Sequence, residues 1–201
     1  MKRFAPVFAM TTALAVVFGT LAVRAESLPA DHPTSALVKK YLTAVVNQDW
    51  NTAGEMLALD SLERKQEETV AIIKMAPTMT EEAAMLAKLG AKDLSDLEKM
   101  DAREFYKAER AAVHDRMEID EAVRKRKQET LKIEVLGLAA DKDGTLVHAT
   151  VRTSQETLTQ RIEEIFLISL RKEGDKWVIV PDMMRPTTEE LTPAEGAAKS
   201  E

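Results

Sequence analysis

The residues best suited to bind a ligand alternate with small apolar residues between positions 147 and 152. Because successive side chains of a strand point to opposite faces, His148, Thr150 and Arg152 share one face of a predicted strand. Their imidazole and guanidinium groups offer a hydrogen-bond donor and a fixed cation to an anionic or polar ligand. In the alternative interpretation, the apolar face of the strand meets the core and this polar face is ordinary sheet surface.

The two tryptophans, Trp50 and Trp177, are the largest aromatic side chains in the sequence. We expect Trp177 to pack between a sheet and a helix, and Trp50 to pack at the end of the first helix. An indole ring is also a flat apolar surface on which a ligand can stack. Trp50 therefore joins the candidate ligand-binding residues.

Several kinds of site lack the residues that they require. The chain has no cysteine, which excludes disulfides, thiol catalysis and cysteine-bound metals. Its three histidines lie far apart, and no HExxH pattern, Gly-rich phosphate loop or Gly-x-Ser-x-Gly turn occurs. The basic run at 124–127 has no interleaved aromatic residues and has acidic residues on both sides. We therefore predict no metal, no cofactor and no nucleic-acid partner.

The polar strand belongs to a longer stretch, residues 131–181, that predicts an antiparallel meander. Apolar runs rich in Val, Ile, Leu and Thr are separated here by turn sequences around Gly144 and Gly174, which is the pattern of β-hairpins. Four strands are expected, at about 131–140, 145–155, 160–171 and 176–181.

The chain before this meander is predicted to be helical. Apolar residues from Leu37 to Val46 recur at three- and four-residue spacings, which gives the first helix an apolar face. Further helices are expected up to about residue 127, with Thr80 and Asp101 as two of their N-terminal caps. Helices followed by an antiparallel sheet indicate an α+β fold, with the N-terminal helices packed on a strongly curved sheet.

The domain organisation follows from composition. Residues 1–25 have a short basic start, an apolar middle and Val23-Arg24-Ala25 at the end, which is typical of a cleaved secretory signal peptide. An uncleaved membrane anchor is the alternative. We expect a single domain at 26–185 and, because residues 186–201 are polar and aperiodic, a disordered tail.

The expected export of the protein and its net charge limit the classes of partner that it can bind. We expect a periplasmic or extracellular protein with no integral membrane segment after cleavage of the signal peptide. Removing Lys2, Arg3 and Arg24 from the 28 basic residues leaves 25 against 34 acidic residues, a net charge of −9. An acidic protein of this kind is poorly suited to bind nucleic acid or anionic lipid surfaces.

Fragments in a fixed order resemble the nuclear transport factor 2-like superfamily, and in particular its secreted bacterial members of unknown function. The resemblance covers about residues 36–181, with extra helices inserted after residue 60. The fragments are Tyr41-Leu42-Thr43-Ala44, Asn47-Gln48-Asp49-Trp50, Leu94-Ser95-Asp96-Leu97-Glu98-Lys99-Met100, Arg103-Glu104-Phe105-Tyr106, Val147-His148-Ala149-Thr150-Val151-Arg152 and Gly174-Asp175-Lys176-Trp177-Val178-Ile179.

The resemblance implies a first helix packed across a bent sheet, which together form a cone with an internal pocket. In relatives similar to ketosteroid isomerase, a Tyr on this helix helps to bind an oxyanion beside a carboxylic acid base, so Tyr41 is a further candidate ligand-binding residue. The strand carboxylates available as a base are Glu134 and Glu163. The pattern around each indicates a solvent-facing position rather than a pocket. The inserted helices are expected at the pocket mouth.

Three functions are consistent with these patterns. The first is a non-catalytic module whose cone holds a small apolar or amphipathic ligand, which requires a continuous cavity with few polar groups. The second is a structural or interaction module with a filled cone, which forms a homodimer or docks a partner through an apolar patch on its sheet. The third, an isomerase-like or dehydratase-like enzyme, requires a convergent acid–base pair and ranks last.

Overall fold

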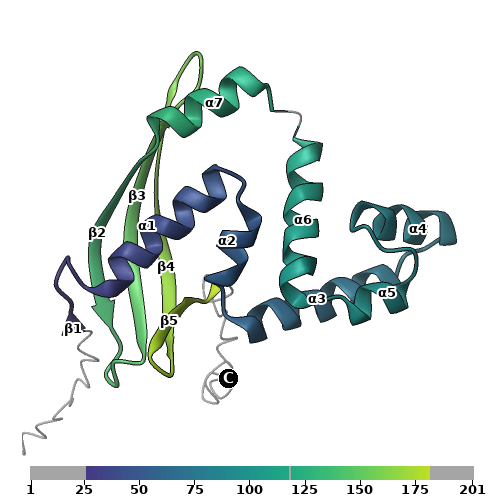
Figure 1. Cartoon of the computed structure of the whole chain (residues 1–201), viewed down its shortest axis with the longest axis horizontal. Helices are drawn as coiled ribbons and strands as arrows, with labels where there is room; N and C mark the ends of the chain where they lie inside the picture. Colours follow the sequence, from purple (N-terminus) through teal and green to yellow (C-terminus); the bar gives the residue numbers. More distant parts are fainter. Residues whose placement is uncertain (1–25, 118, 182–201) are drawn as a thin grey trace, which may run out of the picture.

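The computed structural model describes residues 26–117 and 119–181 and confirms the α+β class (Figure 1). The expected signal peptide and disordered tail lie outside the described residues. The helices are α1 (Pro33–Val46), α2 (Trp50–Glu55), α3 (Leu59–Lys74), α4 (Met79–Lys88), α5 (Leu94–Lys99), α6 (Ala102–Arg116) and α7 (Glu121–Thr130). The strands are β1 (Glu26–Ser27), β2 (Lys132–Ala140), β3 (Leu146–Glu156), β4 (Arg161–Glu173) and β5 (Lys176–Ile179).

The sheet is an open antiparallel meander with the order β1-β2-β3-β4-β5. It has one strand more than the four expected from the sequence, because the two residues of β1 pair with Ala139 and Ala140 at the end of β2. Gly144 and Gly174 have positive φ angles of 67° and 59° in the hairpin turns, a conformation that glycine adopts at low cost. These two glycines therefore form the hairpin turns that the sequence predicted.

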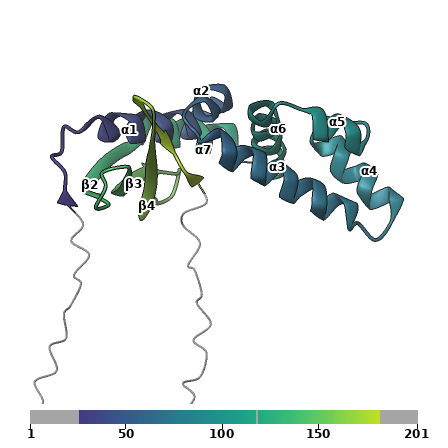
Figure 2. The same cartoon turned by 90° about the horizontal axis from the view of Figure 1, so that it is seen from below.

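One face of the sheet, called here the helix side, packs against α1 (Figure 2). Its centre is filled by side chains with no exposed surface, among them Val38 from α1, Val147 and Val151 from β3, and Leu170 from β4. Trp177 lies half-buried against this core, and its ring meets the edge of the His32 ring with the centroids 5.7 Å apart.

Helices α3 to α6 extend away from the sheet and build a lobe of their own (Figures 1 and 2). The core of this helical lobe contains Val70, Ile73, Leu86, Leu97 and Phe105. The inserted helices were expected at the mouth of a pocket over the sheet. They lie beside the sheet instead. Most of their buried apolar residues pack against one another, while Leu62 of α3 and Tyr106 of α6 join the core under α1.

Local capping explains where two of these helices begin. Asp101 caps α6 as predicted, since its Oδ1 accepts hydrogen bonds from the backbone N–H groups of Arg103 and Glu104 at 2.9 and 3.3 Å. The prediction of Thr80 as the cap of α4 was wrong. Thr78 caps α4, because its Oγ accepts from the N–H of Glu81 at 3.2 Å, and its hydroxyl donates to the Glu81 carboxylate at 3.1 Å.

Among the described residues, none of the helices combines the length and the apolar character that a membrane crossing requires.

Candidate functional site

An apolar groove lies at the edge of the sheet, between α1 and the part of β4 that extends past β5. We call it the edge groove. Its volume is about 260 Å³. It is lined by Tyr41, Leu42 and Val45 from α1, residues 166–169 of β4, and the segment Ile179, Val180 and Pro181. The groove opens to solvent, and its lining is almost entirely apolar, so it suits an apolar side chain or a small apolar molecule.

Tyr41, the candidate carried by the family resemblance, lies at this groove with its phenol beside that of Tyr106 of α6. Burial raises the pKa of both phenols, and the neighbouring Tyr41 hydroxyl raises the pKa of Tyr106 further. The guanidinium carbon of Arg110 lies 5.5 Å from the centre of the Tyr106 ring. The two tyrosines therefore form a neutral polar link between α1 and α6 at neutral pH.

The three polar residues of β3 lie on the sheet face that points away from α1, called here the outer face. His148 and Thr150 line a hollow of about 240 Å³ together with Gly137, Ala139 and Leu167. The Nδ1 atom of His148 lies 2.9 Å from the Oγ of Ser169, its neighbour on β4. Arg152 forms an ion pair with Glu134 of β2, at 3.0 Å between Nη1 and Oε2. The His148 hollow is shallow and has no acid–base pair.

The structure does not bring the five candidate ligand-binding residues into one site. His148, Thr150 and Arg152 share the outer face, whereas Tyr41 lies on the helix side. Trp50 is the first residue of α2 and is half-buried. The alternation along β3 correctly predicted which side chains share a face. The sequence could not predict which face would carry a pocket. That depends on the face against which α1 packs, and this contact joins residues that are far apart in the sequence.

The carboxylates considered as a catalytic base lie at exposed positions. Glu134 is paired with Arg152, and the Oε1 of Glu163 lies 2.7 Å from an Nη of Arg161. Both are on the outer face, as the sequence pattern indicated. Across the described residues there is no group of three or more His, Asp or Glu side chains arranged to hold a metal ion.

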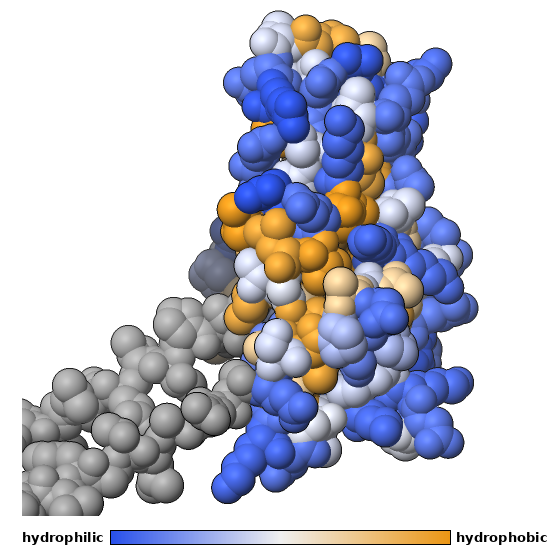
Figure 3. Space-filling model, turned by 90° about the vertical axis from the view of Figure 1, so that its left-hand side faces the viewer, coloured by the Kyte–Doolittle hydropathy of each residue, from blue (hydrophilic) through white to orange (hydrophobic). Residues whose placement is uncertain are grey.

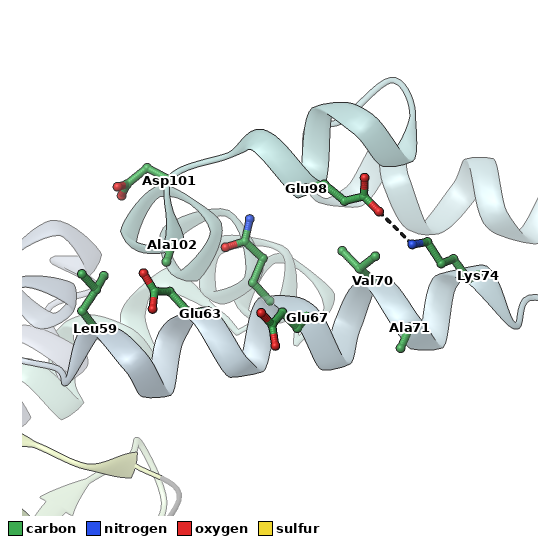
Figure 4. A pocket seen from close by; sticks show the side chains of 10 residues that line it. Leu59, Glu63, Glu67, Val70, Ala71, Lys74, Glu98, Asp101 and Ala102 are labelled. Carbon is green, nitrogen blue, oxygen red and sulfur yellow. Dashed lines mark hydrogen bonds and ion pairs between the residues drawn. The ribbon is translucent and has the colours of Figure 1, made fainter.

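A second, larger groove of about 630 Å³ crosses the helical lobe between α3, α5 and the start of α6 (Figure 4). Glu63, Glu67, Glu98 and Asp101 give it an acidic lining, and Lys74 forms an ion pair with Glu98 at 2.8 Å. The sequence did not single this groove out. In the sequence, its carboxylates have the pattern of charged residues on an exposed helix face. They form one lining only because α3 and α5 pack side by side.

Exposed apolar side chains gather on the outer face of the sheet. Ile165 and Leu167 of β4 are 61% and 41% exposed, and Leu136 at the bulge of β2 is 41% exposed. On the side of the molecule formed by β1 and β2, hydrophobic residues form a central band between hydrophilic regions (Figure 3). The apolar surface of the sheet is therefore not confined to one strand.

Comparison with known proteins gives no relative for this chain: no family model, no curated protein and no solved structure matches it.

Proposed function

We propose that this chain is a non-catalytic interaction module that pairs with a second copy of itself through the outer face of its sheet. The observation that carries the proposal is the exposure of Ile165 and Leu167 on this face, with Leu136 exposed at the neighbouring bulge of β2. Water-exposed apolar side chains that cluster on a sheet are typical of protein–protein contact surfaces. Over the described residues, α1 covers the centre of the helix side and leaves the edge groove as its open apolar surface.

The charges on β4 favour an antiparallel arrangement of two copies. Glu163 lies four residues before Leu167 and Arg171 four residues after it, all on the outer face. A two-fold axis that crosses the strands at Leu167 therefore places Glu163 of one copy opposite Arg171 of the other. The contact is self-complementary, as a two-fold interface must be. Glu163 and Arg171 each form an ion pair within their own copy, with Arg161 and with Asp60, so across the interface they add to these pairs and do not replace them.

The size of the face indicates a weak dimer. Strand β3 has 11 residues, which at ~3.3 Å per residue gives a length of about 36 Å. Three strands at ~4.8 Å spacing are about 14 Å wide, so the flat area is roughly 500 Å² per copy. Stable interfaces bury about 800 Å² per partner. We therefore expect an equilibrium that depends on protein concentration.

Membership of the nuclear transport factor 2-like superfamily and export from the cytoplasm are parts of the same proposal. The packing of a first helix across an antiparallel sheet supports the first, and the composition of residues 1–25 supports the second. The ligand-binding cone implied by the resemblance has less support, since side chains fill the space between α1 and the sheet centre.

Sedimentation velocity over a range of protein concentrations tests the dimer. Ile165→Glu places a charge in the proposed interface and is expected to weaken dimerisation at least tenfold. Ile72→Glu is the matched control, because Ile72 is also 61% exposed but lies on α3 in the helical lobe. A wild-type protein that stays monomeric at all concentrations, or two variants that weaken the dimer equally, would contradict the proposal.

A further inference from the structure

Part of strand β4 has an open backbone edge. β3 pairs with one edge of this strand along residues 161–171, but β5 pairs with the other edge only along residues 170–173. Among the described residues, no strand pairs with this second edge at residues 161–168. An edge of this kind presents unpaired N–H and C=O groups that readily accept another strand.

The described chain turns away from this edge directly after β5. The backbone N–H of Val180 donates to the carbonyl of Ser169 at 2.9 Å. Pro181 has no N–H to donate, and it has left the extended conformation for a 3-10 turn. Over the part of the chain that the structure describes, the line that β5 follows along β4 is therefore free beyond Ser169.

The free edge has a regular hydrogen-bonding pattern. In an antiparallel strand, every second residue directs both its N–H and its C=O to the same side. The carbonyl of Ser169 points to the β5 side, and β4 pairs with β3 without a bulge over residues 161–171. Glu163, Ile165 and Leu167 therefore direct their N–H and C=O groups to the open edge, while their side chains lie on the outer face.

The edge groove lies directly beside these backbone groups. Its wall on β4 is formed by four consecutive residues, 166–169. Because the side chains of consecutive residues alternate between the two faces of a sheet, the groove meets β4 along its backbone edge. Its wall on α1 is formed by Tyr41, Leu42 and Val45, which give the side chains of an added strand an apolar contact surface.

We propose that the open edge of β4 is a docking site for an extended segment of a partner protein, which joins the sheet as an antiparallel strand. In this mode of recognition, main-chain hydrogen bonds supply the affinity and pockets for alternate side chains supply the specificity. The unpaired backbone groups of β4 provide the first, and the edge groove on the helix side provides the second. The proposed dimer contact differs, because it uses side chains of the outer face and not the backbone edge.

The residues along the edge define the chemistry of the segment. Counted from its N-terminal end, its first and third residues lie opposite Leu167 and Ile165 and exchange hydrogen bonds with them. Its second residue lies opposite Phe166 and faces the edge groove, so it should be apolar. Its fourth residue lies opposite Glu164, an exposed carboxylate with no ion-pair partner among the described residues. A lysine or arginine there forms a cross-strand pair of opposite charges.

A blocked pentapeptide tests the proposal on the full chain. It carries threonine at its first, third and fifth positions, leucine at the second and lysine at the fourth. The titration is followed by NMR at a protein concentration at which sedimentation shows a monomer. Saturating peptide is expected to shift the amide signals of Ile165 and Leu167 and to slow their hydrogen exchange at least tenfold. The amides of Phe166 and Ile168 point to β3 and serve as internal controls with unchanged exchange.

Two N-methylated forms of the peptide separate strand pairing from simple filling of the groove. Methylation of the threonine nitrogens removes the N–H groups that face β4 and is expected to weaken binding at least tenfold. Methylation of the leucine and lysine nitrogens removes N–H groups that face away from β4 and is expected to leave binding nearly unchanged. The register is tested by Glu164→Lys, which should weaken binding of the lysine peptide and favour a peptide with glutamate at the fourth position.

Three outcomes would overturn the proposal. The first is the absence of shifts at Ile165 and Leu167 with saturating peptide. The second is equal binding of the two N-methylated peptides, which would make the groove a pocket for a side chain alone. The third is slow exchange of the same two amides without peptide, which would assign the edge to the chain itself or, if seen only at high protein concentration, to a second copy. The proposed dimer is tested by Ile165→Glu and sedimentation, so the two proposals fail independently.

Discussion

Gln66 shows how a single polar side chain holds two helices of the helical lobe together. Its Nε2 donates to the carbonyl of Leu97 at 2.6 Å and to that of Met100 at 2.9 Å, and the residue is 8% exposed. These carbonyls lie at the C-terminal end of α5, where a helix leaves carbonyls without partners. One amide on α3 thus satisfies the end of a six-residue helix that has little stability of its own.

We expect Gln66→Leu to lower the free energy of unfolding by about 2 kcal/mol. The Met100 carbonyl then loses the Gln66 donor and the Leu97 carbonyl keeps only the N–H of Met100, while the buried volume is kept. Urea denaturation measures this change. Glu67→Leu is the control, since Glu67 is exposed on the same helix and should change stability by no more than about 0.5 kcal/mol. Equal losses in both variants would show that the helix, and not the pair of hydrogen bonds, is responsible.

Tyr41 and Tyr106 connect α1 to α6 at the scale of whole elements, and both have a raised pKa. Below pH 10, the ordinary pKa of a phenol, both are neutral in the folded and the unfolded protein. Above it, the unfolded chain releases protons that the folded protein retains. Stability is therefore fully present below pH 10 and is lost as the pH rises further.

The expected result is a steep alkaline loss of stability that Tyr106→Phe reduces, with a change of no more than about 1 kcal/mol at pH 7 for the removed hydroxyl. Urea denaturation at pH 7 and at pH values above 10 measures both effects. The chain has only two tyrosines, so its tyrosinate absorbance reports this pair alone. Ionisation at pH 10 in the still folded protein would contradict the prediction.

The elements differ in how far the sequence could predict them. The hairpins of β2 to β5 depend on local turns at Gly144 and Gly174, so their positions followed from the sequence. β1 has only two residues and no pattern of its own, and it exists because β2 offers an edge. For α3 to α6, periodicity predicted apolar faces but could not say whether they meet the sheet or one another. For the same reason, the sequence could not decide whether His148 and Tyr41 lie on the same side of the sheet.

At the scale of the whole molecule, the chain has two cores that meet along α6. Phe105 is buried in the core of the helical lobe, while its neighbour Tyr106 is buried in the core between α1 and the sheet. The ion pair from Arg171 of β4 to Asp60 of α3, at 2.8 Å, joins the lobes at a second place. The helical lobe has seven buried core residues against 17 in the sheet core.

A core of seven residues is too small to be stable without support, so the coupling between the lobes should be asymmetric. Leu97 and Leu170 are both fully buried, one in each core, and truncation to alanine costs about 3–5 kcal/mol at such sites. Leu97→Ala is expected to speed hydrogen exchange in α3 to α5 and leave β3 and β4 protected. Leu170→Ala should speed exchange in both lobes, because the smaller core loses the surface that supports it.

Hydrogen exchange followed by mass spectrometry of peptides from α3, α5, β3 and β4 distinguishes the two variants. If Leu97→Ala exposes β3 and β4 as much as α3 and α5, the two cores unfold as one unit, and the link through α6 is rigid. If the predicted asymmetry is found, the helical lobe can open while the sheet and its outer face stay folded. In that case, dimerisation through the sheet should withstand Leu97→Ala and weaken with Leu170→Ala.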